Sequence, residues 1–158
     1  VYKRQQLPGP TLRPDQPGEA SLTNAFSQPL VSTPTNAAAP APYILPVAGP
    51  VVTGFGSPVA GGLSQGLVFA PLSNAQIVAP APGRVAFAGA YRGYGKIVII
   101  AHDGGWTSLI TGLGQINAAV GDELVGGAPV GRAAARAPSI GLELRRDGTP
   151  VNPLSIAR

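Results

Sequence analysis

The chain has 158 residues, of which 44% are hydrophobic and 11% charged, with no Cys and a single His, His102. The lack of Cys excludes disulfide frameworks, thiolate metal sites and thiol nucleophiles, and one His cannot supply a zinc site of two or three imidazoles. The net charge of +4 comes from scattered Lys and Arg, without the basic stripe interleaved with aromatic residues that a nucleic-acid partner requires. No apolar run approaches the ~18 residues of a membrane-spanning helix.

Gly and Pro divide the chain into two parts. Ten of the 18 Pro lie in residues 1–50, whereas 19 of the 22 Gly lie in residues 51–158. Closely spaced Pro favours irregular or polyproline-like chain, and frequent Gly marks turns. We therefore predict a Pro-rich tail or linker over residues 1–45 and a turn-rich folded domain over residues 46–158.

One stretch of the tail, residues 19–28, has room for a short helix between two prolines. A helix there would place Leu22, Ala25 and Phe26 on one face. Because an isolated helix of this length is marginal in water, the segment is either a solvated linker or a docking segment whose apolar face another surface covers.

The remainder shows the short, Gly-punctuated strands of an all-β fold. The nearly continuous aliphatic run over residues 96–101 predicts the most buried strand, and a Gly-containing turn would pair it with residues 106–111. Alternation places Val85 and Phe87 on one face. Strands are predicted over residues 51–55, 67–70, 76–78, 84–88, 96–101, 106–111, 123–125, 129–131 and 139–145, with a helical turn over 153–157.

Five motifs follow one another along this part of the chain. They read P-V-A-G-P-V-V-T-G-F-G from residue 46, I-V-A-P-A-P-G-R-V from 77, G-Y-G-K-I-V-I-I-A-H from 93, V-G-D-E-L-V-G-G-A-P-V from 120 and L-E-L-R-R-D-G-T-P-V-N-P from 142. In this order, over residues 45–155, they resemble the lysostaphin-like (LytM-type) metallopeptidase domain of bacterial cell-wall enzymes. The resemblance implies an antiparallel β-sandwich with an open groove.

The positions that hold zinc and catalyse hydrolysis in active members of that family are replaced here. Ser64 and Val68 stand where H-x-G-x-D supplies the first two ligands, and Ser139 and Gly141 stand where H-x-H occurs. Gly112 falls where a further catalytic His is expected. None of these residues offers an imidazole or a carboxylate, so we expect no metal, no cofactor, no activated water and no enzymatic activity.

The single His of the chain does not support a hydrolase of another kind. In the family pattern His102 belongs to a hairpin turn away from the groove, where we expect turn hydrogen bonding. A serine hydrolase built on Ser64 or Ser139 would need this His as its base, and it lies on a different hairpin.

A LytM-type domain without zinc ligands resembles the EnvC-type activators of cell-wall amidases. The resemblance implies a periplasmic protein that binds an N-acetylmuramyl-L-alanine amidase and relieves its autoinhibition during daughter-cell separation. The alternative is a module that binds peptidoglycan without cleaving it.

The five replaced positions predict a roomy, uncharged groove that binds a partner. Tyr94 at the rim, Ile97, Arg145 and Gln65 are the further candidates for partner contacts, with Arg145 suited to hold a carboxylate or carbonyl oxygen. The alternative is that Tyr94 caps the hairpin, Ile97 is core and Arg145 is a solvated strand residue. We also hypothesise that segment 19–28 lies in the groove and blocks it until released.

Overall fold

The computed structural model describes residues 40 and 42–157. The predicted helix over residues 19–28 lies outside this part of the chain. Within it the fold is all-β with antiparallel strand pairs, as predicted, and its two helical elements are single 3-10 turns. The elements are β1 (Val51–Thr53), β2 (Pro58–Val59), β3 (Gly62–Leu63), β4 (Leu67–Phe69), β5 (Gln76–Val78), β6 (Gly83–Tyr91), β7 (Gly95–Ala101), η1 (Asp103–Gly105), β8 (Trp106–Ile116), β9 (Glu123–Leu124), β10 (Pro129–Ala133), β11 (Ile140–Arg146), β12 (Thr149–Val151) and η2 (Pro153–Ser155).

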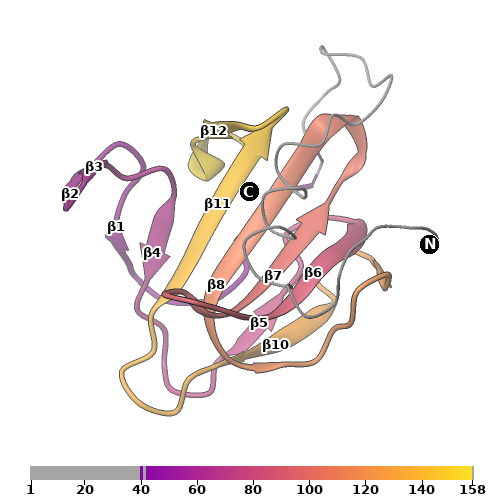
Figure 1. Cartoon of the computed structure of the whole chain (residues 1–158), viewed down its shortest axis with the longest axis horizontal. Helices are drawn as coiled ribbons and strands as arrows, with labels where there is room; N and C mark the ends of the chain where they lie inside the picture. The colour runs from indigo at the N-terminus through magenta and orange to yellow at the C-terminus, as the bar shows by residue number, and fades with distance from the viewer. Residues whose placement is uncertain (1–39, 41, 158) are drawn as a thin grey trace.

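One large sheet forms both layers of the domain. Its main path runs β1-β4-β11-β8-β7-β6-β9, while β10 pairs with β5 and with the second half of β8. Figure 1 shows β5 and β10 at the lower end of β8, and the small β2–β3 hairpin beyond β1 and β4 on the other side. Ile77 of β5 and Val130 of β10 belong to the same buried cluster as Ile110 and Leu142 of the main path. The core therefore lies between the main sheet and its β5–β10 branch.

Several strands differ in length from the prediction. β6 and β8 continue to Tyr91 and Ile116, beyond residues 88 and 111, because their second halves pair with β7 and β10. The loop predicted after residue 55 contains the β2–β3 hairpin. Among residues 40 and 42–157, no helix is long and apolar enough to cross a membrane.

The central strand β7 is buried on both faces, as its aliphatic run predicted. Ile97, Val98, Ile99 and Ile100 are fully buried. Val98 and Ile100 face the main core, whereas Ile97 and Ile99 belong to a second cluster on the opposite face of the sheet.

The prediction that Val85 and Phe87 share one face is wrong. Val85 pairs with Ile100 and Phe87 with Ile99, so a bulge lies between them. The extra residue of a bulge shifts the alternation of side chains. Val85 therefore lies in the main core and Phe87 in the second cluster.

The folded domain begins earlier than the predicted residue 46. Tyr43 is fully buried and forms a parallel bridge with Ala157, and the amide of Ile44 donates to the carbonyl of Pro80 at 2.9 Å. The two ends of the domain therefore lie side by side. Residues 43–45 belong to the domain rather than to the tail.

A series of buried hydrogen bonds holds Tyr43 in place. The Tyr43 hydroxyl lies 2.8 Å from Ser108 Oγ, which lies 2.8 Å from His102 Nε2, and His102 Nδ1 lies 2.6 Å from the carbonyl of Pro82. Because a carbonyl only accepts, Nδ1 carries the proton, and neutral Nε2 accepts from Ser108. Ser108 then accepts from Tyr43. His102 thus takes part in a buried network instead of the expected turn bonding.

Burial lowers the pKa of His102, although the Pro82 carbonyl and Asp103 act in the other direction. Burial also raises the pKa of Tyr43, which keeps its hydroxyl protonated as a donor. The network therefore stabilises the neutral form of the His102 imidazole.

The lowered pKa predicts a loss of stability in acid. Below its ordinary pKa of 6.5, His102 takes up a proton in the unfolded chain before it does so in the folded one, so the free energy of unfolding falls as the pH falls. His102→Gln should flatten this dependence. Urea unfolding of both proteins at about pH 7.5 and about pH 5.5 measures it, and equal slopes would contradict the assignment.

Candidate functional site

Strand register brings the replaced ligand positions to one face of the sheet. Thr53 on β1 pairs with Val68 on β4, Val68 with Gly141 on β11, Gly141 with Thr111 on β8, and Thr111 with Ile97 on β7. These residues form one row across five strands. A second row runs through Glu143, Leu109, Ile99 and Phe87 on the same face.

A pocket of about 580 Å³ opens over the β1–β4–β11 end of this face. Its floor includes Val68, Gly141 and Glu143, and its walls come from the β2–β3 hairpin and from Tyr94. Ser64 and Gln65 also line it. The predicted groove therefore brings together Ser64, Gln65, Val68, Tyr94 and Gly141.

The pocket does not fit a zinc ion. Ser64 Oγ donates to the carbonyl of Gly66 at 2.8 Å, and Val68 is apolar. A Cβ at Gly141 would lie 2.5 Å from Thr111 Oγ1, so Thr111 occupies the space from which a ligand side chain would start. Within the part of the chain that the structure describes, no three His, Cys, Asp or Glu side chains are grouped to hold a metal.

Gly112 and Ser139 lie beside the pocket and not in its lining. Gly112 has φ of 83°, and a Cβ there would lie 2.1 Å from the carbonyl oxygen of Ser139. This is the position at which active relatives would place a catalytic His. Here it requires Gly, because the backbone of Ser139 comes too close for any side chain. A His introduced at Gly112 would require the β10–β11 loop to move.

The groove is charged, contrary to the prediction. Glu143 lines the pocket, and its Oε1 accepts from Arg145 Nη2 at 2.9 Å. Arg145 also donates to the carbonyl of Gly148 at 3.1 Å and to Gln65 Oε1 at 3.2 Å. Partners on strand β11, in the β11–β12 turn and in the β3–β4 loop therefore hold the guanidinium beside the pocket.

Sequence reasoning missed Glu143 and the β2–β3 hairpin. In the sequence, the apolar residues of this strand alternate with Gly141, Glu143 and Arg145. Alternate residues of a strand share a face, so a signal for Glu143 was present. No comparable signal existed for Val59 and Leu63 of the hairpin, which are exposed apolar residues in a Gly- and Ser-rich segment.

Tyr94 and Ile97 have different surroundings. Tyr94 is 51% exposed, lines the pocket and packs against Tyr91 with ring centroids 5.6 Å apart. Ile97 lies on the groove face but is fully buried. Ile97 is thus inaccessible to a partner in this state, which differs from the expectation of an open contact residue.

The β6–β7–β8 half of the groove face is apolar and buried. It consists of Phe87, Ile97, Ile99 and Leu109. Together with the adjacent, partly buried Tyr91 these residues form the second hydrophobic cluster of the domain.

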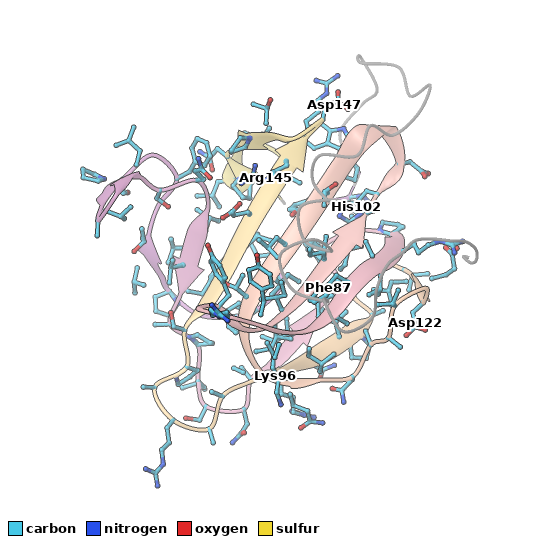
Figure 2. All side chains as sticks on the ribbon, viewed as in Figure 1. Phe87, Lys96, His102, Asp122, Arg145 and Asp147 are labelled. Atoms are coloured by element: carbon cyan, nitrogen blue, oxygen red, sulfur yellow. The ribbon has the colours of Figure 1, made fainter. Side chains whose placement is uncertain are left out.

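His102 lies away from the groove. Its partner Ser108 precedes Leu109 on β8, so the two side chains point to opposite faces. Figure 2 shows His102 near the upper end of the strands, Arg145 on β11 and Lys96 at the lower end.

These features define a two-layered β domain with a pocket at the β1–β4–β11 end, lined in part by Ser64, Val68 and Gly141. Residues 62–153 match the model of Peptidase family M23. The chain belongs to this family, and the predicted LytM-type resemblance is confirmed.

The relatives of this chain include named activators. It is 32% identical over 113 residues to the murein hydrolase activator EnvC of Escherichia coli (strain K12), covering 68% of this chain and 27% of EnvC. It is 30% identical over 151 residues to the murein hydrolase activator NlpD of Salmonella dublin, covering 89% of this chain and 40% of NlpD. The chain thus spans well under half the length of these curated relatives.

A solved structure supports the fold. A putative peptidase M23 from Pseudomonas aeruginosa superimposes with a TM-score of 0.68 at 28% identity, covering 87% of this chain and 57% of that one.

Gly112→Ala should destabilise the domain more than Gly93→Ala. Both glycines have positive φ, but a Cβ at Gly93 meets nothing within 4 Å. Gly93→Ala should therefore cost about 1 kcal/mol from backbone strain alone, and Gly112→Ala about 3 kcal/mol, because the Ser139 carbonyl must also move. Urea unfolding measures both, and equal losses would show that the contact with Ser139 is unimportant.

Proposed function

We propose that this chain is a non-catalytic activator of a cell-wall hydrolase. The observation that carries the proposal is the pocket itself, whose ligand positions hold Ser64, Val68 and Gly141 while the strand framework of the family is retained. Without imidazole or carboxylate ligands, the pocket has no means to bind and activate water through zinc. What remains is a concave surface suited to binding.

The names of two relatives support the activator role. EnvC and NlpD are both named murein hydrolase activators. We infer that the hydrolase is an N-acetylmuramyl-L-alanine amidase, that the chain relieves its autoinhibition in daughter-cell separation, and that both proteins act in the periplasm. Purified chain should increase the release of soluble murein by the amidase while releasing none alone, and digestion by the chain alone would overturn the proposal.

The pocket offers two kinds of contact to the hydrolase. Tyr94 and the β2–β3 residues Val59 and Leu63 present exposed apolar surface around its rim, and exposed Tyr is a frequent interface anchor. Arg145 presents a guanidinium whose Nη2 donates to Gln65 Oε1 at 3.2 Å. A carboxylate or carbonyl oxygen of the hydrolase would replace Gln65 there, because Glu143 and Gly148 hold the guanidinium from the other sides.

Arg145→Glu should abolish hydrolase binding without unfolding the domain. The substitution replaces the donor with an acceptor and sets it beside Glu143. Arg84→Glu is the matched control, because Arg84 also pairs with a Glu, Glu123, and lies away from the groove. Isothermal titration with the amidase should show a loss for Arg145→Glu alone, and wild-type affinity in that variant would remove Arg145 from the binding site.

We further propose that residues 19–28 regulate the groove. This segment lies outside the described residues, and the proposal rests on the apolar character of the face formed by Phe87, Ile97, Ile99 and Leu109. Leu22, Ala25 and Phe26 supply apolar side chains of the kind that such a face needs. The 14 residues between 28 and 43 reach roughly 45 Å when extended, which is more than the width of a domain of this size.

Leu22→Asp with Phe26→Asp should uncover the apolar half of the groove. The variant should bind the amidase about fivefold more tightly, since the hydrolase no longer competes with the segment, and should increase the fluorescence of a hydrophobic dye. Leu7→Asp with Leu12→Asp changes the tail equally outside the segment and serves as control. Unchanged affinity in the first variant would refute this regulation and leave the activator proposal intact.

A further inference from the structure

The cationic side chains of the domain fall into two groups. Arg84 pairs with Glu123, Arg145 pairs with Glu143, and Arg146 stacks over the Trp106 ring, next in sequence to Asp147. The other four described cations are all exposed and carried by the β6–β7 turn, the start of β7, β10 and the β10–β11 loop. They are Arg92, Lys96, Arg132 and Arg136.

The fold places these four at the end of the sheet where the second half of β8 lies. Lys96 pairs with Leu113 and its Nζ donates to the carbonyl of Gly114 at 3.0 Å. Arg132 pairs with Gln115, the next position outward on the same strand.

Two further contacts place the β10–β11 loop, which carries Arg136, and the β6–β7 turn, which carries Arg92. The loop that carries Arg136 leaves β10 beside β8, because a Cβ at Gly114 would lie 2.7 Å from Ala134 Cα. Arg92 lies in the turn closed by the pairing of Tyr91 with Gly95, immediately before Lys96. We call these four residues, Arg92, Lys96, Arg132 and Arg136, the cationic end.

No acidic side chain of the described residues lies on the elements of the cationic end. Asp103 and Asp147 lie at the opposite end of the strands, Asp122 and Glu123 at the β9 edge, and Glu143 in the groove. Figure 2 shows Lys96 far from Asp147, with Asp122 at a separate edge. The cationic end therefore concentrates positive charge on a chain whose overall charge is only +4.

The arrangement suits a polymer with repeated anionic groups. A single exposed ion pair contributes little, but several cations engaged by one polymer act together. The cationic end adjoins the rim of the pocket through the β6–β7 turn, where Tyr91 and Tyr94 stack beside Arg92. Aromatic faces at this point can pack against the apolar faces of sugar rings.

We propose that the cationic end binds the carboxylates of peptidoglycan at a site separate from the groove. The choice of polymer rests on the proposed function, whereas the charge arrangement does not. Binding at this site would hold the activator on the substrate of the hydrolase that docks in the groove. The polymer and the hydrolase would occupy neighbouring surfaces that meet at Tyr94.

Charge-reversal variants test whether binding depends on the cationic end or only on the net charge of the chain. Arg136→Glu and Arg92→Glu should each weaken co-sedimentation with purified sacculi about threefold, and the double variant about tenfold. Arg84→Glu changes the net charge equally at an exposed position elsewhere and should leave binding within about twofold. Raising NaCl from about 50 to about 200 mM should weaken wild-type binding, and sacculi with amidated carboxyl groups should bind poorly.

The outcomes separate this site from the groove. The double variant should keep wild-type affinity for the amidase, and Arg145→Glu should keep wild-type binding to sacculi. Equal losses in Arg84→Glu and Arg136→Glu, undiminished binding to amidated sacculi, or tighter binding to DNA than to sacculi would each overturn the proposal. Loss of amidase affinity in the double variant would also overturn it and assign the cationic end to the hydrolase interface.

Discussion

The alternation of side chains across antiparallel strands is the constraint on which the whole domain depends. On β11, Ile140, Leu142 and Leu144 enter the core, so Gly141, Glu143 and Arg145 necessarily face the groove. A shift of the register by one residue would exchange the two sets. The same strand register therefore sets which residues enter the core and which face the groove, and the groove retains its shape as long as the core is retained.

This coupling explains how the strand framework of the family is retained although other residues stand at its ligand positions. The pocket has lost its ligands, yet the backbone around it remains tightly packed. Gly112 approaches the Ser139 carbonyl, and Gly141 faces the Thr111 hydroxyl. Larger side chains at these two glycines would collide with existing structure, so restoring a ligand set requires more than restoring the missing residue types.

The groove face is divided in its chemistry. The β1–β4–β11 end holds an open pocket with the Glu143–Arg145 ion pair, whereas the β6–β8 end is apolar and buried. An open polar half and a buried apolar half can respond to different parts of one partner.

The sequence by itself determined the all-β class, the burial of the aliphatic strand β7, the alternation of β11 and the loss of zinc ligands, because these follow from local periodicity and residue type. Only the tertiary structure decided that a bulge separates Val85 from Phe87, that Tyr43 belongs to the core and that Glu143 and Arg145 pair beside the pocket. It also placed four cations that are scattered in the sequence at one end of the sheet. These features depend on strand register and on contacts between residues far apart in the chain, which local patterns do not encode.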